Sequence, residues 1–203
     1  MKFEKNELWI VLICIIMVLI GFYFSLKHKN IIITPKEPIK SSIKSSINLE
    51  EVSKLITRHE GIRNKVYLDT QGNPTIGIGF NLNNSDSRER IEELGLNFES
   101  VFVGFDSLTN KQIKSLFDKD LSNSIKDAIS FLPDFDNQPD KVKIVLVDMS
   151  FNMGLTRLNQ FVKFKDALIT KDYKRASKEM KDSRWYNQVG NRSKELAGIM
   201  RTI

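Results

Sequence analysis

Residues 60–79 read EGIRNKVYLDTQGNPTIGIG, and this stretch decides the fold of the chain. Its middle, Gln71-Gly72-Asn73-Pro74, is a turn signal that separates two short runs rich in β-forming residues. Residues 65–82 are therefore expected to form a small hairpin sheet. A carboxyl group precedes the hairpin at Glu60 and a second stands beside its turn at Asp69.

Helical periodicity lies on both sides of the hairpin. Before it, apolar residues recur on one helix face over 49–56, and Gly61 can end that helix as a left-handed cap. After a polar, acidic segment, Thr109–Gln112 has the spacing of a capping box, which predicts a long helix of about six turns up to Pro133. Helical patterns then continue over 141–203. This order predicts an α+β fold of two lobes joined by a long helix, with a substrate cleft between them.

Glu60 and Asp69 lie on either side of the step from helix to hairpin. A glycosidase needs two carboxyl groups across one sugar bond: one donates a proton to the leaving oxygen, and the other activates water or acts as a nucleophile. By spacing alone, two solvated surface carboxylates are the simpler interpretation, because 22 acidic residues lie beyond residue 48.

Three ordered motifs favour the catalytic interpretation. They are EG, VYLDTQG and PTIGIG within 60–79, MSFNMG at 149–154, and SRWYNQVGNR at 183–192. With these motifs the chain resembles the T-even phage lysozymes, glycoside hydrolase family 24, over residues 50–202. The resemblance implies a lysozyme-like two-lobe fold, which agrees with the periodicity.

The resemblance also implies catalytic roles. Glu60 matches the general acid, which must hold its proton at the working pH and so needs partial burial. Asp69 matches the ionised partner, and Thr75 matches the residue that holds the attacking water. The family is described as inverting, so Asp69 is expected to act as a base rather than a nucleophile.

Four further positions match substrate-binding residues of the family: Asn81, Phe151, Asn152 and Arg192. Arg192 corresponds to the arginine that pairs with the catalytic Glu, although a helix-surface cation is the simpler interpretation of that residue alone. For Phe151, a place in the core explains the residue nearly as well as a place in the cleft.

The chain departs from the family pattern at several positions. Phe80 stands where the family has a histidine, which removes an ionic interaction linked to stability. Asn81 replaces an apolar cleft residue, and Phe164 and Glu179 occupy two further cleft positions. The contacts to individual sugars are therefore expected to differ from the family pattern.

The N-terminal segment predicts a membrane anchor. Residues 8–26, LWIVLICIIMVLIGFYFSL, hold 19 residues without a charge, enough to cross a hydrocarbon core about 30 Å thick. Lys27-His28-Lys29 follows where a cleaved signal peptide has small residues. We expect an anchor in 1–29, a juxtamembrane linker rich in Pro, Ser and Lys at 30–48, and a catalytic domain at 49–203.

The net charge of +6 hides two regions of opposite sign. Residues 49–140 hold 10 Lys and Arg against 16 Asp and Glu, and residues 141–203 hold 14 against 6. This division suits an anionic, peptide-bearing glycan better than a nucleic acid, for which the chain has no recognition motif. The lysines that flank the anchor lean toward a cytoplasmic domain. A wall substrate requires the opposite, and we expect an extracytoplasmic domain.

The residue counts exclude other kinds of site. A single cysteine, Cys14, rules out an intramolecular disulfide and a multi-thiolate metal centre. His59 precedes Glu60 without the second histidine of a zinc motif, so we interpret it as a partly exposed helix residue. No metal or cofactor is expected.

The sequence thus predicts a monomeric, single-pass membrane lysozyme. Its expected reaction is hydrolysis of the β-1,4 bond between N-acetylmuramic acid and N-acetylglucosamine in the glycan strands of bacterial peptidoglycan. The alternative is a membrane-anchored, peptidoglycan-binding module that has lost catalysis. The intact Glu60, Asp69 and Thr75 favour the enzyme, whereas the altered cleft residues favour the binding module.

Overall fold

A computed structural model gives the structure of the protein, and it describes residues 47–203. The predicted anchor at 8–26 and nearly all of the predicted linker lie outside these residues. Between residues 47 and 203, no helix is both long and apolar enough to cross a bilayer.

Helix α3 (Leu49–Glu60) is the first element of the described residues and carries Glu60 at its end. The Asn48 side chain accepts a hydrogen bond from the Glu51 backbone N–H, which caps the first turn. The apolar face buries Val52, Leu55 and Ile56, as the periodicity predicts. The helix stops at Gly61, whose φ of +72° suits glycine and few other residues.

The predicted hairpin is present as an antiparallel sheet in the order β1-β2-β3. It consists of β1 (Arg63–Leu68), β2 (Pro74–Gly77) and β3 (Phe80–Asn81). The third, two-residue strand is not predicted by the sequence pattern. Thr75 lies opposite Tyr67 on one side and opposite Asn81 on the other, so the register gathers these three residues at one place in the sheet.

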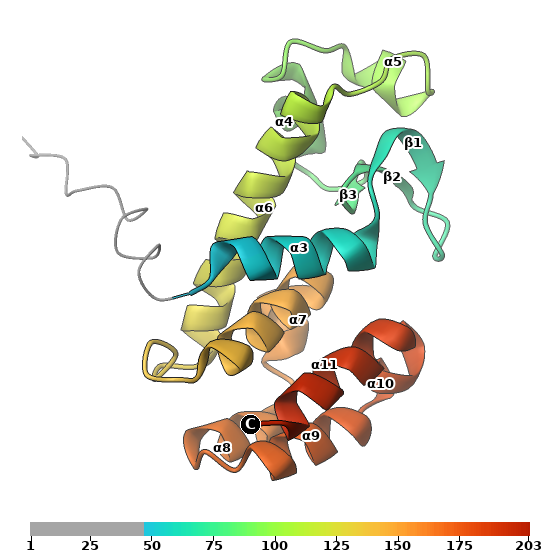
Figure 1. Cartoon of the computed structure of the whole chain (residues 1–203). Coiled ribbons are helices and arrows are strands. Elements are labelled where there is room, and N and C mark those ends of the chain that lie inside the picture. Colours follow the sequence, from blue (N-terminus) through green and yellow to red (C-terminus); the bar gives the residue numbers. More distant parts are fainter. Residues whose placement is uncertain (1–46) are drawn as a thin grey trace, which may run out of the picture. The chain divides into compact units, whose positions relative to one another are not determined.

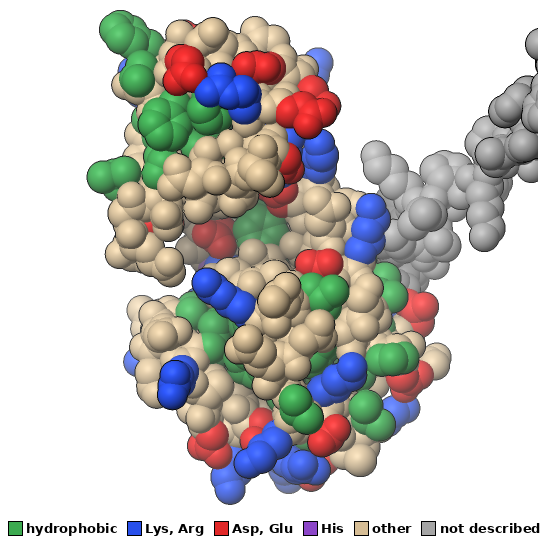
Figure 2. Space-filling view, turned by 180° about the vertical axis from the view of Figure 1, so that it is seen from behind, with side chains coloured by type: hydrophobic (Ala, Val, Ile, Leu, Met, Phe, Trp, Pro, Cys, Tyr) green, Lys and Arg blue, Asp and Glu red, His purple; other side chains and the backbone are tan. Residues whose placement is uncertain are grey.

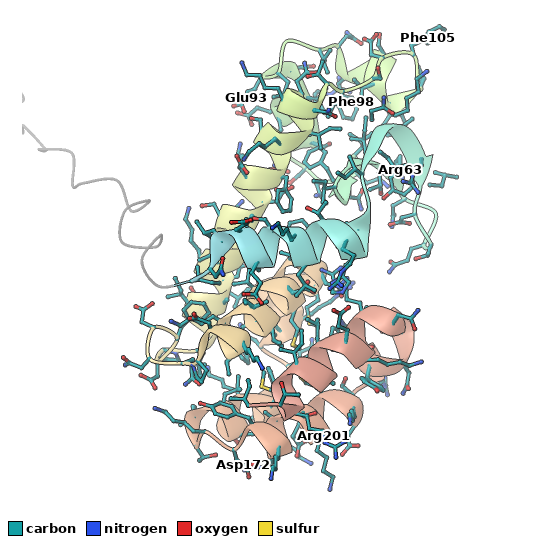
Figure 3. All side chains as sticks on the ribbon, viewed as in Figure 1. Arg63, Glu93, Phe98, Phe105, Asp172 and Arg201 are labelled. Atoms are coloured by element: carbon teal, nitrogen blue, oxygen red, sulfur yellow. The ribbon has the colours of Figure 1, made fainter. Side chains whose placement is uncertain are left out.

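The polar segment after the sheet contains two short helices, α4 (Ser87–Glu92) and α5 (Phe98–Phe102), which the sequence reading does not separate from loop. Each buries only a few side chains, so the apolar period is too short to see. Phe98 is buried beneath the Arg88 guanidinium, 4.4 Å from its ring centroid. Phe105, just beyond α5, is 86% exposed and points away from the molecule in Figure 3.

The long helix α6 (Asn110–Phe131) begins at the predicted capping box and joins the sheet-containing lobe to the helical lobe (Figure 1). Thr109 accepts a hydrogen bond from the Gln112 backbone, and the Gln112 side chain accepts one from the Thr109 backbone. The helix ends at Leu132, immediately before Pro133, because the residue preceding a proline avoids the helical conformation.

The helical lobe is built around α7 (Asp140–Leu158), which is buried continuously from Val142 to Ser150. Gly154, with a φ of +71°, breaks this helix where the sequence predicts an end. Helices α3, α6 and α11 pack against α7. The other helices of the lobe are α8 (Val162–Ile169), α9 (Tyr173–Lys181), α10 (Arg184–Val189) and α11 (Asn191–Arg201). The sequence pattern does not single out α10.

The sheet-containing lobe keeps an ion pair despite the missing family histidine. Phe80 is 2% exposed, and the Arg90 guanidinium lies 4.5 Å from its ring centroid. Arg90 donates to the Asp120 carboxylate at 2.6 Å and to the Leu116 carbonyl at 3.0 Å. Arg90, stacked on Phe80, therefore forms an ion pair that links α4 to α6.

Candidate active site

Glu60 is held at the end of α3 with its side chain 21% exposed. Its carboxyl group lies against the turn between β2 and β3. A Cβ atom added at Gly79 would come within 2.8 Å of Glu60 Oε2, and Gly79 has a φ of +69°. Glycine at this position therefore serves both the turn and the close approach of the carboxyl group.

Arg192 reaches Glu60 from the first turn of α11. Its Nη1 donates to Glu60 Oε1 at 2.5 Å, and its Nε donates to Asp148 Oδ1 at 2.6 Å. Burial by itself lowers the pKa of Arg192, but the negative charges of Asp148 and Glu60 outweigh burial and raise that pKa above its ordinary value. Arg192 is 8% exposed, so the expected contact with Glu60 is present and is shared with a second carboxylate.

Asp69 occupies the turn between β1 and β2 and is held by local hydrogen bonds. Its Oδ1 accepts from the backbone N–H groups of Asn73 and Gln71, each at 2.8 Å, and its Oδ2 accepts from Asn73 Nδ2 at 3.1 Å. The backbone and then the side chain of Asn73 are the main causes that lower the pKa of Asp69. Hydrogen bonds to the charged form thus keep this carboxylate ionised.

The charges of both carboxyl groups act on Tyr67. Its pKa is raised, first by burial and then by the negative charge of Glu60, with a further contribution from Asp69. Arg63, whose guanidinium lies 5.9 Å from the ring centroid, acts in the opposite direction. The phenol therefore lies within electrostatic reach of both carboxylates. The sequence reading passes over this residue, although its place two positions before Asp69 in the motif is a usable signal.

Thr75 lies next to the Asp69 turn and is 3% exposed. Its hydroxyl donates to the Asn73 carbonyl at 3.1 Å, which leaves the oxygen lone pairs as acceptors. Asn81, opposite Thr75 in the sheet, accepts a hydrogen bond from the Asn83 backbone N–H at 2.8 Å. The Asn81 side chain is therefore fixed by its own turn.

A groove of about 1130 Å³ extends along the helical lobe from Gln71. Asn152 lines it, as do Phe164 and Glu179, the two residues at which the chain departs from the family pattern. Asn152 Oδ1 accepts a hydrogen bond from the Trp185 indole N–H at 2.8 Å, which fixes the orientation of both side chains. A hollow between the two lobes, with an acidic side chain visible in it, is seen in Figure 2.

The predicted site residues fall into two groups. Glu60, Asp69, Thr75, Asn81 and Arg192 come from α3, the sheet and α11, and they do not line the groove. Asn152 lines the groove from the helical lobe. Phe151 is partly buried with its ring centroid 5.8 Å from that of Phe117, so it packs at the junction of α6 and α7.

Two residues near Glu60 make a contact that the sequence pattern does not predict. Asp148 is completely buried on α7. His59 is a partly exposed helix residue, as expected, although its side chain is only 7% exposed. His59 Nδ1 lies 2.9 Å from Asp148 Oδ2. A charged residue inside the apolar run of 142–149 is the one signal that could have identified Asp148.

Comparisons with known proteins find relatives that cover most of the chain. Two probable T4-type lysozymes of Dictyostelium discoideum are similar to the chain. Number 2 is 29% identical and number 1 is 28% identical, each over 170 residues that cover 80% of this chain and 95% of the relative. The pre-baseplate central spike protein Gp5 of Enterobacteria phage T4 is 29% identical over 161 residues, which cover 74% of this chain and 28% of the spike protein.

The family model described as phage lysozyme matches residues 57–202, a stretch that begins just before Glu60 and ends at the last turn of α11. It spans the sheet, the long helix and the helical lobe, and so covers most of the chain. The chain therefore belongs to the phage lysozyme family and is a glycosidase of the lysozyme class.

Proposed function

We propose that this protein hydrolyses the β-1,4 bond between N-acetylmuramic acid and N-acetylglucosamine in peptidoglycan, with Glu60 as general acid and Asp69 as general base. The observation that carries the proposal is the contrast between the two carboxyl groups around Tyr67. Asp69 is kept ionised by backbone and amide donors, whereas Glu60 lies at a partly buried helix end beside Gly79. Two carboxyl groups in different environments are what acid and base roles require.

The proposed reaction is a single displacement. The Glu60 carboxyl group donates its proton to the glycosidic oxygen as the bond from that oxygen to the anomeric carbon breaks. A water molecule, oriented by the Thr75 hydroxyl, attacks the anomeric carbon from the opposite face and gives its proton to Asp69. Proton exchange with solvent then restores both carboxyl groups.

Arg192 permits Glu60 to change its protonation state. A buried guanidinium left without a counter-charge is costly, but Arg192 keeps its bond to Asp148 when Glu60 is protonated. The shared pairing therefore positions the general acid without requiring it to remain ionised.

The groove supports a peptide-bearing glycan as substrate. Apolar Phe161, Phe164 and Trp185 line it together with Arg157, Lys163 and Arg184. Phe164 and Trp185 are 1% and 7% exposed, so they form the floor of the groove, and the partly exposed Phe161 is the aromatic surface that remains for a sugar ring. The cations suit the carboxylates of stem peptides. The chain acts as a monomer in this proposal.

The proposed setting is a membrane surface. Residues 8–26 form a single-pass anchor, 30–48 a linker, and 49–203 the catalytic domain on the extracytoplasmic side. The uncharged apolar run supports the anchor. Protease added to right-side-out spheroplasts is expected to degrade the catalytic domain. Protection of the domain until the membrane is opened would contradict this topology.

The enzymatic proposal is tested with the full-length chain in mild detergent. We expect it to clear a suspension of purified walls and to release new reducing ends at N-acetylmuramic acid, detected by borohydride reduction and mass spectrometry. Glu60→Gln keeps the size of the side chain but has no acidic proton, so clearing should fall about 100-fold or more. Glu51→Gln, an exposed position of the same helix, is the matched control and should clear normally.

A wall-binding module without catalysis is the second candidate, because Phe164 and Glu179 change the groove. It predicts co-sedimentation with walls and no new reducing ends for either the unaltered chain or Glu60→Gln. Equal clearing by both proteins would contradict the proposed role of Glu60.

A further inference from the structure

His59 lies between two carboxylates. Its Nδ1 is 2.9 Å from Asp148 Oδ2, and its Nε2 is 3.1 Å from Glu195 Oε2. An ionised carboxylate can only accept hydrogen bonds, so both ring nitrogens must carry protons for both contacts to form. The geometry is therefore that of an imidazolium cation. Its partner on α7, Asp148, is completely buried, and its partner on α11, Glu195, is partly exposed.

His59 belongs to a continuous series of alternating charges that ends at the general acid. We call Glu60, Arg192, Asp148, His59 and Glu195 the ion-pair chain. Each neighbouring pair is in contact, at 2.5, 2.6, 2.9 and 3.1 Å in that order. Asp148 is completely buried and divides its two oxygens between Arg192 and His59. A change in the charge of the His59 ring therefore changes the interaction of Arg192 with the carboxylate that the two residues share.

The groups around His59 decide when it loses its proton. Asp148 faces it from α7, Glu195 and Arg192 face it from α11, and Arg58 and Glu60 flank it on α3. Burial lowers the pKa of His59, but Asp148 and Glu195 outweigh burial and the opposing charge of Arg192, and the pKa is raised above its ordinary value. The ring therefore keeps its proton to a higher pH than an ordinary histidine does.

We propose that His59 is a positioning residue whose proton sets how strongly Arg192 holds the general acid Glu60, and that it thereby couples pH to catalysis. The inference rests on the proposed roles of Glu60 and Asp69. When the His59 ring is charged, Asp148 is shared by two cations, so Arg192 interacts more strongly with Glu60. When the proton leaves Nε2 for solvent past Glu195, Arg192 becomes the sole cation on Asp148, and its hold on the Glu60 carboxylate weakens.

The first test is an NMR titration that needs no activity. The chain has two histidines, so the full-length His28→Gln variant retains a single imidazole, His59. We expect its titration midpoint above about 6.5, the ordinary value for histidine. Coupling is reciprocal, so adding Glu60→Gln should lower the midpoint by roughly 0.3 unit or more, whereas Glu51→Gln should not change it. An unchanged midpoint with Glu60→Gln overturns the proposal.

The second test is the pH dependence of kcat/KM on wall fragments. His59→Gln removes the ring charge, and we expect the alkaline limb to move to higher pH by roughly half a unit or more. Arg58→Gln is the matched control, because it removes one positive charge from the exposed outer side of Glu195, and its alkaline limb should stay in place. A merely structural ring would lower the rate by one factor at every pH without moving the limb, which overturns the proposal.

The two readouts separate this inference from the proposed function. A chain that shows the coupling between Glu60 and His59 but hydrolyses no wall contradicts the muramidase and supports the ion-pair chain. A chain that hydrolyses walls but shows no coupling contradicts the role of His59 alone. If His59→Gln fails to fold, the titration with Glu60→Gln decides.

Discussion

The two carboxyl groups of the site are held in opposite ways. Asp69 is partly exposed on a turn and accepts hydrogen bonds from residues at most four positions away. Glu60 is held by Arg192, which is 132 positions away and itself depends on Asp148. A local turn thus positions Asp69, whereas the position of Glu60 depends on the folded helical lobe. The turn should tolerate distant changes that disable Glu60.

The strongest way to break this contrast is Arg192→Met, which removes the cation from the site. Asp148 would be left as a buried charge with only His59 as partner, and losing one member of a buried pair costs about 3–5 kcal/mol. We expect a loss of that size in the free energy of unfolding, measured by urea denaturation, together with loss of wall clearing. A variant as stable as the unaltered chain would show that Asp148 does not need Arg192.

Gly79→Ala tests the acid without touching its cation. The new Cβ meets the Glu60 carboxyl group at 2.8 Å, so Glu60 must move, and we expect kcat to fall about 100-fold. Gly77→Ala is the matched control, since it has the same φ of +69° but its Cβ meets only Ile113, at 3.7 Å. Both variants should lose about 1–2 kcal/mol of stability from backbone strain. Equal kcat values for the two variants would show that Gly79 is not needed to position Glu60.

The pH dependence of stability tests the ion pairs that hold Glu60. The pKa of His59 is raised by folding, so its contribution to stability is full below the ordinary value of about 6.5 and is lost as pH rises through the folded value. Unfolding by urea between pH 6 and pH 9 should therefore show a decline in stability that His59→Gln makes shallower. Parallel curves for the two proteins would contradict the imidazolium assignment.

The smallest expected effect is on the side of Asp69. Asn73→Ala removes the amide donor but keeps the backbone N–H, so the pKa of Asp69 should rise only part of the way to its ordinary value. A lowered pKa means that the ionised form is favoured, so activity is lost as pH falls through it. We expect the acid limb of kcat/KM to move to higher pH by a few tenths of a unit while the alkaline limb stays. Movement of both limbs would show that the two carboxyl groups are not held independently.

The same distinction explains what the sequence could predict. The hairpin turn, the capping box at Thr109 and the stop at Gly61 are signals that lie within a few residues, and the structure has all three. The position of Asp69 beside the hairpin turn can be predicted for the same reason. The family resemblance, rather than any local pattern, supplied the pairing of Arg192 with Glu60.

The remaining features depend on contacts between distant residues. Asp148 meets His59 across 89 positions, so no short motif reveals that the ring is buried. The short helices α4 and α10 contain six residues each, less than two turns, which is too few for a helical period to be recognised. The pairing of Arg90 with Asp120 beside Phe80 spans 30 positions, so no short motif predicts it.

The packing of α3 on α7 has a consequence for the order of events during synthesis. Glu60 leaves the ribosome more than 80 residues before Asp148 and more than 120 before Arg192. Helix α3, whose apolar face packs on α7, is therefore synthesised well before its packing partners. The sheet beside it can already form from local contacts. Glu60 is therefore the last part of the site to be positioned, long after the turn that holds Asp69 can form.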